Sequence, residues 1–356
     1  MESGDRSRAL IIEHYKRYPK MRIADLFKYL FQSAFGCEHL VLSEESAIEN
    51  IKREYANIKK LQTVLTDRLD GEYSRVHFFS LESGLMPETL GKIFCLSAKA
   101  ERDGKENIKD KLQVARELIA NGDLPFDLAE FDAELVKWEE QGYSALHHSE
   151  VFRYAYSPAY RVVANEYVKF LSLFTEIDKK LTKGSVTVAI EGGSASGKTT
   201  LGKMIERIYD CNVFHMDDFF LRPEQRTKER YAEVGGNVDR ERFLYEVLLP
   251  TSKREDVNYR RFDCGTQTIE EPVSIESKRI TIVEGAYSMH PELAPYYDIS
   301  VFLDISAEHQ MERILKRNSP ELAERFFKEW IPLEKLYFEK TDIKRRCTLV
   351  INTEND

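Results

Sequence analysis

A glycine-rich segment in the second half of the chain constrains the fold more than any other feature of the sequence. It consists of Gly192, Gly193, Ser194, Ala195, Ser196, Gly197, Lys198, Thr199 and Thr200. A β-branched run, residues 185–190, precedes it, and a helix-like stretch begins at Lys198. The pattern G-x-x-x-x-G-K-[ST] between a strand and a helix is typical of a phosphate-binding loop. An ordinary glycine- and serine-rich turn is the alternative, and it is disfavoured because motif, strand and helix occur together.

The residue types in this loop suit the binding of a nucleoside triphosphate. Small residues let backbone N–H groups approach phosphate oxygens, and the N-terminus of the following helix adds partial positive charge. We expect Lys198 to neutralise the β- and γ-phosphates and the Thr199 hydroxyl to bind Mg²⁺. The sequence therefore predicts ATP and Mg²⁺ as cofactors, with ATP held by residues 192–200.

Charge, cysteine content and hydropathy narrow the range of partners and locations. A net charge of −9 leaves no excess of cations for a nucleic-acid backbone, so no nucleic-acid partner is expected. The 5 cysteines are scattered without C-x-x-C spacing, which indicates free thiols in a reducing compartment. No apolar stretch approaches the ~20 residues that span a bilayer. We therefore expect a cytoplasmic protein without a membrane partner, and whether it forms a homo-oligomer stays open.

The two halves of the chain differ in periodicity, and a length of 356 residues also favours two domains. In residues 21–35, 108–120 and 161–177 the apolar side chains fall on one helical face, while residues 76–81 look strand-like. The charged segment 179–184 ends in glycine and marks the boundary. The predicted organisation is a mainly α-helical N-terminal domain of unknown role over residues 1–180 and a kinase domain with the phosphate-binding loop over residues 184–356.

Short β-branched runs alternate with helical stretches after the boundary. The candidate strands are residues 185–190, 213–215, 279–283, 299–303 and 348–351. Strands that alternate with helices form a parallel sheet with right-handed crossovers. The predicted fold class of this domain is therefore α/β, a P-loop NTPase domain with a parallel five-stranded sheet flanked by helices.

Acidic residues follow two of the candidate strands. Asp217 and Asp218 come after the second strand, and Glu284 follows the third, where a Walker B-type carboxylate is expected. Ligands of open α/β sheets bind at the carboxyl ends of the strands. Phosphoryl transfer needs a proton acceptor and carboxylates that hold the metal, which we assign to Asp217 and Glu284. The alternatives are a helix N-cap at Asp217–Asp218 and a surface turn at Glu284.

These motifs resemble a known group of P-loop kinases. The loop, HMDDFF at 215–220, VEGAYS at 283–288 and FLDISAEHQMERILKRN at 302–318 are similar to the family of uridine kinase, phosphoribulokinase and pantothenate kinase. The resemblance covers residues 184–352 and is strongest toward uridine kinase-like proteins. It implies that Asp217 takes the proton of the acceptor hydroxyl beside the metal, and that Glu284 assists Mg²⁺ binding.

The family also closes an arginine-bearing lid over the phosphates. Arg313, Lys316 and Arg317 lie in the matching region, and we expect Arg313 and Arg317 to act in catalysis by stabilising charge on the transferring group. A solvated helix face is the alternative for these cations.

The region expected to bind the acceptor departs from the family pattern. Uridine kinases carry a D-H-P-type segment where this sequence has residues 235–239, followed by a hairpin that residues 258–263 match. In this hairpin Tyr259 or Phe262 could stack on a flat acceptor, and Asp263 could accept a hydrogen bond from a hydroxyl. Arginine suits an acidic or phosphorylated acceptor, so Arg261 joins Asp217, Tyr259 and Asp263 as an expected substrate-binding residue. The identity of the acceptor stays open.

The first half carries no recognisable catalytic motif. The polar residues that stand out there are Cys37, Glu38, His39, His147, His148, Arg153 and Arg161. A metal site is disfavoured because the histidines lack the spacing of a helix-face pair. A phosphate- or nucleotide-sensing role for Arg153 and Arg161 is a minor alternative, and residues 151–160 are expected to serve packing.

Together the sequence predicts an ATP-dependent small-molecule kinase. It would transfer the γ-phosphoryl group to a hydroxyl of a nucleoside- or sugar-like metabolite. The alternative is a nucleotide-dependent switch that controls a partner through the N-terminal domain, and a separate activity of that domain is a third possibility.

Overall fold

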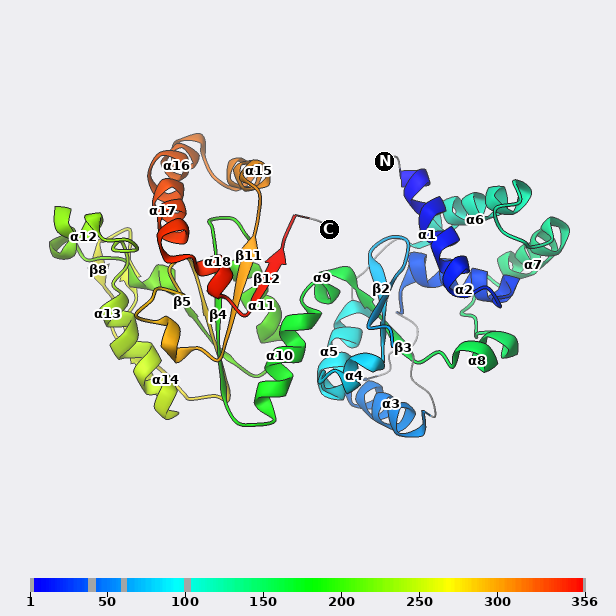
Figure 1. The fold of residues 1–356 in the computed structure, drawn as a ribbon, viewed down its shortest axis with the longest axis horizontal. Coiled ribbons are helices and arrows are strands. Elements are labelled where there is room, and N and C mark those ends of the chain that lie inside the picture. The colour runs from blue at the N-terminus through cyan, green and yellow to red at the C-terminus, as the bar shows by residue number, and fades with distance from the viewer. Residues whose placement is uncertain (1–2, 38–42, 59–62, 99–103, 355–356) are drawn as a thin grey trace. The chain divides into compact units, whose positions relative to one another are not determined.

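The chain divides into two compact units, Met1–Thr175 and Glu176–Asp356. The computed structural model describes residues 3–37, 43–58, 63–98 and 104–354 (Figure 1). Each unit has its own hydrophobic core and is described by itself.

The first unit is mainly helical. Its helices are α1 (Ser3–Arg17), α2 (Ile23–Phe35), α3 (Glu44–Asn57), α4 (Phe79–Glu82), α5 (Pro87–Ala98), α6 (Gly104–Ala120), α7 (Leu128–Glu140), α8 (Glu150–Tyr156), α9 (Asn165–Val168) and α10 (Leu171–Leu181), whose end lies in the second unit. The antiparallel strands β1 (Thr66–Arg68), β2 (Tyr73–His77) and β3 (Tyr160–Ala164) form a sheet in that order. The helical character of this half confirms the prediction from periodicity.

Two segment predictions in the first unit need correction. Residues 161–177 were expected to be one helix, but strand β3 occupies Tyr160–Ala164 before the chain becomes helical. Strand β3 pairs with β2, and the β-branched pair Val162 and Val163 is buried there. The strand expected at 76–81 ends at His77, and α4 follows from Phe79. In both cases a short apolar run fits either periodicity, and pairing across the sheet decides between them.

Helix α2 forms the centre of the first unit's core. Leu26, Phe27, Leu30 and Phe31 on this helix are buried. The Phe27 ring stacks on Trp138 of α7 with centroids 5.0 Å apart. The same helix also buries the polar side chains of Asp25 and Gln32, which the apolar periodicity does not explain.

The second unit contains a five-stranded parallel sheet, as predicted. Its strands are β4 (Val186–Gly192), β5 (Asn212–His215), β10 (Ile280–Glu284), β11 (Ile299–Asp304) and β12 (Leu349–Asn352), and their order is β12-β11-β4-β10-β5. The chain passes to one side of β4 for β5 and β10, and to the other side for β11 and β12. The change of side falls at β4, so the carboxyl end of β4 lies at the topological switch point where ligands bind in open α/β sheets.

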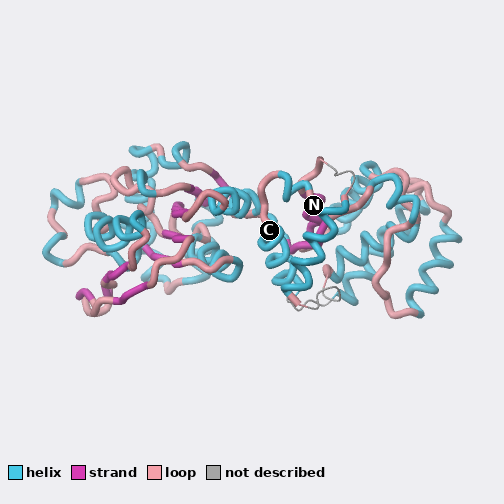
Figure 2. Tube along the Cα trace, turned by 90° about the horizontal axis from the view of Figure 1, so that it is seen from below, coloured by secondary structure: helices cyan, strands magenta, loops and turns pink. Residues whose placement is uncertain are grey.

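Helices and short hairpins surround this sheet (Figure 2). The helices are α11 (Lys198–Ile208), α12 (Lys228–Ala232), α13 (Arg240–Phe243), α14 (Leu249–Lys253), α15 (Ala307–Arg317), α16 (Pro320–Arg325), α17 (Ile331–Thr341) and α18 (Ile343–Arg346). The short helical turns are η2 (Met216–Phe219), η3 (Pro223–Gln225), η4 (Leu244–Leu248), η5 (Ala294–Tyr296) and η6 (Phe326–Trp330). Strand β6 (Val257–Tyr259) pairs with β9 (Val273–Ile275), and β7 (Phe262–Asp263) pairs with β8 (Thr268–Ile269).

Candidate active site

The phosphate-binding loop connects the central strand β4 to helix α11. Ala195 and Gly197 have positive φ angles of 61° and 101°, which turn the chain into the first helical residue, Lys198. The Lys198 ammonium donates hydrogen bonds to the carbonyls of Gly192 and Gly193 at 2.8 and 2.9 Å. The lysine is thereby held over the loop, in the position from which it would reach a phosphate group.

Gly192 shows why this loop needs glycine where β4 ends. Its φ angle is 152°, and a Cβ atom there would lie 2.8 Å from both the Leu303 carbonyl oxygen and the Ser196 hydroxyl. The backbone of β11 therefore approaches β4 too closely for any side chain at this position. Thr200, also expected in the loop site, is exposed on the first turn of α11.

Glu284, Thr199 and His215 form a polar cluster beside the loop. Glu284 is buried at the end of β10, and His215 of β5 lies opposite it in the sheet register. The Thr199 hydroxyl and His215 Nδ1 donate hydrogen bonds to Glu284 Oε1 at 3.0 and 2.6 Å. Burial alone would raise the pKa of Glu284, but the hydrogen bond from His215 and the charge of Lys198 lower it. The carboxylate is therefore kept ionised.

Asp217 lies in η2, directly after β5, and opens to solvent. Partial loss of hydration raises its pKa, and the nearby Glu284 carboxylate adds to this, whereas Lys198, His215 and Arg317 oppose the rise. The charges of Lys198, Glu284 and Arg317 therefore all act on the Asp217 carboxylate. A carboxylate with a raised pKa is better able to accept a proton.

The oxygen donors in this cluster fit Mg²⁺. Thr199 Oγ1 and Glu284 Oε1 are 3.0 Å apart, and the Asp217 carboxylate is close enough to Glu284 for their charges to interact. Magnesium prefers oxygen ligands and is usually held by one or two carboxylates together with substrate phosphates and water. Among the described residues, no group of three or more His, Cys, Asp or Glu side chains could hold a metal by itself.

The two arginines expected in the lid, Arg313 and Arg317, make different contacts. Arg313 of α15 donates to the backbone carbonyls of Ala195 and Thr353, at 3.3 and 2.6 Å, so it braces the loop. Arg317 lies over the Phe326 ring at 5.6 Å, and its charge lowers the pKa of Asp217. Arg317 is therefore the better placed of the two to act on a group beside Asp217.

Two buried glutamates that the sequence did not single out hold the loop. Glu334 of α17 accepts hydrogen bonds from the backbone N–H and hydroxyl of Ser194 at 2.9 and 2.6 Å. Glu191 of β4 accepts from the N–H groups of Gly192 and Met289. Burial raises the pKa of Glu191 to about 7. Glu191 precedes the glycine motif directly, which is the only sequence signal that could have identified it, whereas Glu334 is 140 residues from its partner.

The hairpin residues expected to bind the acceptor have other contacts. Tyr259 is only 2% exposed, and its ring stacks on Phe219, so its face is occupied by the core. The Asp263 carboxylate accepts from Gly265 N and Thr266 Oγ1 and so closes its own turn. The expected stacking by Tyr259 is corrected to a packing role, and Asp263 is occupied by the turn. These contacts depend on tertiary packing that the hairpin motif does not contain.

Arg261 stays near the acidic pair. Its guanidinium lies 3.5 Å from the Asp218 carboxylate and donates to the Tyr259 hydroxyl at 3.1 Å. Asp218 adjoins Asp217, so Arg261 is a cation at the edge of the same site.

A cavity of about 560 Å³ lies beside η2. Its lining combines the segment after η2, the hairpin and the segment from α16 to α17. It includes Phe220, Arg226, Asn237, Phe262, Cys264 and Trp330. Burial and the charge of Asp217 raise the pKa of the Cys264 thiol on one wall of the cavity. Phe262, which the sequence suggested as a stacking residue, is the member of the hairpin that lines the space.

A central strand, a phosphate-binding loop and carboxylates at neighbouring strand ends define a P-loop kinase of the nucleotide-binding α/β class. The chain belongs to the phosphoribulokinase/uridine kinase family, whose family model matches residues 187–325.

The chain is similar to several known proteins. A uridine kinase of Bacillus cereus is 30% identical over 155 residues, which cover 40% of this chain and 70% of the relative. A uridine kinase of Clostridium perfringens is 28% identical over 153 residues, which cover 40% of this chain and 71% of the relative. A structure of a possible uridine kinase from Bacillus stearothermophilus aligns with 51% of this chain and 99% of its own, at 21% identity and a TM-score of 0.37.

The polar residues singled out in the first half have mixed outcomes. Glu38 and His39 lie outside the described residues. The buried His148 forms a hydrogen bond with Asp25, whereas His147 is exposed.

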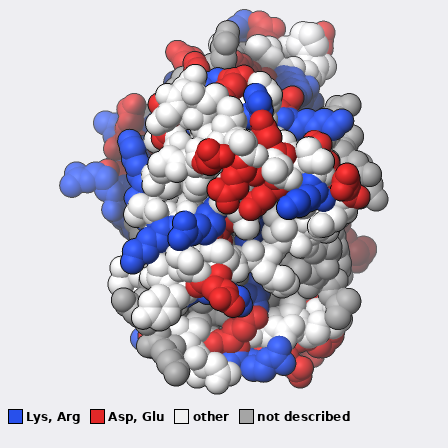
Figure 3. Space-filling view, turned by 90° about the vertical axis from the view of Figure 1, so that its right-hand side faces the viewer, with Lys and Arg blue, Asp and Glu red and all other residues white. Residues whose placement is uncertain are grey.

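In the part of the chain that the structure describes, no helix is both long and apolar enough to cross a bilayer. On the face of the first unit in Figure 3, basic and acidic side chains are interspersed.

Proposed function

We propose that this protein transfers the γ-phosphoryl group of ATP to a hydroxyl group of a small nucleoside- or sugar-like metabolite. The observation that carries the proposal is the position of Asp217. Asp217 follows β5 directly, its carboxylate interacts with the charges of Lys198, Glu284 and Arg317, and the segment just after it lines a 560 Å³ cavity through Phe220 and Leu221. A switch that only binds and releases a nucleotide needs no second cavity beside a proton acceptor.

The phosphate-binding loop would hold the donor. Backbone N–H groups of residues 192–200 would bind phosphate oxygens, and Lys198 would leave the Gly192 and Gly193 carbonyls to contact the β- and γ-phosphates. Thr199, Glu284 and Asp217 would hold Mg²⁺, which neutralises charge on the phosphates when it is bound.

The chemical step follows from the position of the carboxylate. Asp217 would accept the proton of the acceptor hydroxyl while the oxygen of that hydroxyl forms a bond to the γ-phosphorus. The bond from that phosphorus to the bridging oxygen breaks, and ADP leaves with the electron pair. Arg317 would stabilise the charge on the transferred group, and Arg313 would do so through the loop that it braces.

The cavity indicates the kind of acceptor. Phe220, Phe262 and Trp330 offer aromatic surface for a flat or ring-shaped molecule, while Arg226 and Asn237 offer hydrogen-bond donors. The curated relatives are uridine kinases, so nucleosides are the first class to test. Arg261, beside Asp218, would add a cation for a polar acceptor.

An acceptor panel tests the proposal. ADP release is measured with nucleosides, sugars and small hydroxy acids for the wild type and for Asp217→Asn, with ATP binding followed separately. We expect at least one hydroxyl compound to stimulate ADP release, and Asp217→Asn to abolish this stimulation while ATP binding is retained. ADP release at the same rate with and without every acceptor would contradict the proposal and favour the nucleotide switch.

The remaining expectations from the sequence are part of this proposal. We infer a kinase domain over residues 184–356 and a separate N-terminal domain over residues 1–180. A cytoplasmic location without membrane partners stays part of the proposal, and the negative net charge argues against a nucleic-acid partner. A homo-oligomer stays an open prediction, which sedimentation of the full chain would test.

A further inference from the structure

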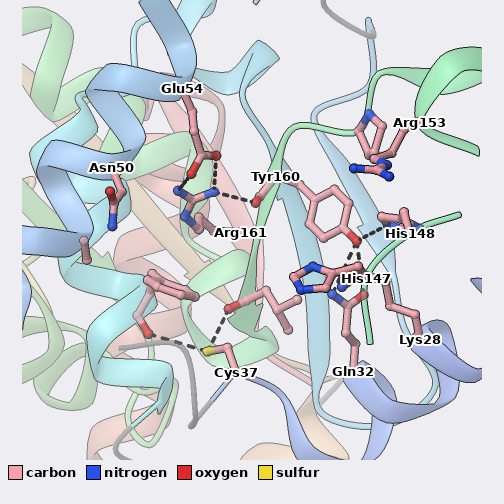
Figure 4. Close-up of a pocket in the computed structure, with 14 residues that line it drawn as sticks. Lys28, Gln32, Cys37, Asn50, Glu54, His147, His148, Arg153, Tyr160 and Arg161 are labelled. Carbon is pink, nitrogen blue, oxygen red and sulfur yellow. Dashed lines mark hydrogen bonds and ion pairs between the residues drawn. The ribbon is translucent and has the colours of Figure 1, made fainter. Parts of the chain in front are cut away.

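A second cavity, of about 420 Å³, lies within the first unit (Figure 4). Helices α2, α3 and α8 and strand β3 supply its polar lining. Its polar and charged lining residues include Lys28, Gln32, Glu54, Arg153, Tyr160 and Arg161. All of them belong to one compact unit, so the cavity does not depend on the position of the second unit.

A directed chain of hydrogen bonds fixes one wall of the cavity. The buried Asp25 carboxylate accepts a hydrogen bond from His148 Nδ1 at 3.0 Å, so His148 Nε2 accepts a hydrogen bond from the Tyr160 hydroxyl at 2.6 Å. Gln32 Nε2 donates to the Tyr160 oxygen at 3.3 Å, and Gln32 Oε1 accepts from the buried Arg75 at 2.8 Å. Each donor in this chain meets an acceptor, so the wall is held in place before any ligand binds.

Among the described residues that line this cavity, the cations outnumber the carboxylates. Arg161 is matched by Glu54 through two hydrogen bonds of 2.8 and 2.9 Å. Lys28 donates to the backbone carbonyl of Leu146 at 2.6 Å but has no carboxylate within ion-pair distance among residues 3–37, 43–58, 63–98 and 104–354. The Arg153 side chain has no hydrogen-bond or ion-pair partner within the same ranges. Figure 4 shows Lys28 and Arg153 on the same side of the cavity as His148.

The lowered pKa of Lys28 agrees with the shortage of carboxylates beside this lysine. Burial, followed by the charge of Arg75, lowers the pKa of Lys28 to about 8. The amine has lost water without gaining an anionic neighbour strong enough to compensate. A negatively charged ligand beside it would restore its pKa and offset the cost of burial.

The remaining lining favours an organic molecule over a bare ion. Phe94, Pro158 and Val162 give the cavity apolar surface next to the cations. A site with convergent cations and apolar walls recognises a charged group attached to a carbon skeleton. Two unmatched cations balance the charge of a phosphate monoester, which is close to −2 near neutral pH.

We propose that this cavity is a second ligand site, which binds a small phosphate ester with its phosphate group between Lys28 and Arg153. Arginine and lysine together suit a phosphate because the guanidinium forms paired hydrogen bonds and the ammonium acts as a compact charge. The apolar side would hold the organic part against Phe94 and Pro158. This proposal is independent of the chemistry proposed for the second unit.

The test must exclude binding at the phosphate-binding loop. The full chain therefore carries Lys198→Ala, which removes the loop cation, and Trp330→Phe, which leaves Trp138 as the only tryptophan. Trp138 is buried in the first unit, so its fluorescence reports the thermal unfolding of that unit. The probes are inorganic phosphate, ribose 5-phosphate and citrate, and a ligand of the folded unit raises its unfolding midpoint.

We expect ribose 5-phosphate to raise the midpoint at lower concentrations than inorganic phosphate, because only the ester can use the apolar wall. Lys28→Gln and Arg153→Ala should each weaken this effect about tenfold or more, since each removes a hydrogen bond to a charged group. Lys109→Gln, an exposed lysine of α6 outside the cavity, is the matched control and should change nothing.

Three results would overturn the proposal. They are an absence of any shift with either phosphate compound, equal shifts in the Lys28 and Lys109 variants, and a larger shift with citrate than with the ester. Because Arg153 is exposed, Arg153→Ala should leave the midpoint without ligand unchanged, which separates lost binding from lost folding. Arg153→Lys should restore part of the shift.

Discussion

In the second unit, the polar side chains of the candidate active site lie at or directly after the ends of adjacent parallel strands, where Asp217 and Thr199 are exposed. In the first unit, they form a buried chain that connects Asp25, Gln32, Arg75, His148 and Tyr160 from distant segments. The first arrangement follows from the sheet topology, because strand ends converge wherever a parallel sheet forms. The second depends on how helices and a small sheet pack. The comparison shows that similar residue types gather at strand ends in one unit and form a buried hydrogen-bonded chain in the other.

Replacing the loop lysine should affect only the second unit, and it should have the largest effect. For Lys198→Ala we expect acceptor-dependent turnover to fall by about 1,000-fold or more, because a phosphate-stabilising cation is lost from the transition state. The midpoint of Trp138 unfolding should not change. Activity near that of the wild type would show that the loop does not hold the donor as described.

Removing the buried arginine should affect only the first unit. Arg75 is 1% exposed and bonds to Gln32 on α2, with Asp67 3.7 Å away. For Arg75→Met we expect the free energy of unfolding of this unit to fall by about 3–5 kcal/mol, because Asp67 and Gln32 lose their partner in the core. Urea unfolding followed by Trp138 fluorescence in the Trp330→Phe background measures this loss.

Arg68→Met provides the control for that substitution. Arg68 lies on the neighbouring strand β1 with an exposed side chain, so its loss should change stability by no more than about 0.5 kcal/mol. Similar losses for both arginines would mean that the buried chain does not stabilise the unit.

The pH dependence of the first unit should be smaller but distinctive. Burial lowers the pKa of His77 and His148 to about 4 and lowers that of His14 as well. The unfolded chain gains protons near pH 6.5, whereas the folded unit does not until the pH approaches 4. Stability should therefore be complete above pH 6.5 and fall as the pH drops from 6.5 to 4, by about 1.4 kcal/mol per pH unit for each histidine.

Charged neighbours face these histidines and set the size of the effect. Arg75 and Arg17 oppose protonation of His77, whereas the Asp25 carboxylate favours protonation of His148. Neither ring nitrogen of His77 has a hydrogen-bond partner among the described residues. His77→Leu should therefore reduce the slope of unfolding free energy against pH. An unchanged slope would show that His77 already titrates normally in the folded unit.

Much of the second unit could be predicted from the sequence because its signals are local. Each of the five strands gives a short β-branched run, and the loop, Asp217 and Glu284 follow strands directly. Parallel pairing then brings these strand ends together without further information. Glu334 could not be found in this way, since its bond to Ser194 joins residues 140 positions apart. The stacking role expected of Tyr259 could not be judged from the hairpin pattern, which does not show that its ring packs on Phe219 in the core.

For the first unit, the sequence predicted only that the domain is mainly helical. Helical periodicity gave α2 and α6 correctly, but it extended over β3, where pairing with β2 decides the structure. The cavity of the first unit could not be predicted from the sequence, because Lys28, His148 and Tyr160 come together only when the helices and strands pack. Arg153 and Arg161 were singled out as cations, yet the sequence does not show that Glu54 matches one and not the other.

Transfer of labelled phosphate tests the central proposal most directly. ATP that carries a label in the γ-phosphoryl group is incubated with the full chain and the acceptor that stimulates ADP release. The account predicts that the label appears in a phosphate monoester of the acceptor, in an amount equal to the ADP formed, and that Asp217→Asn forms neither product. Label found in inorganic phosphate, with none in the acceptor, would contradict it.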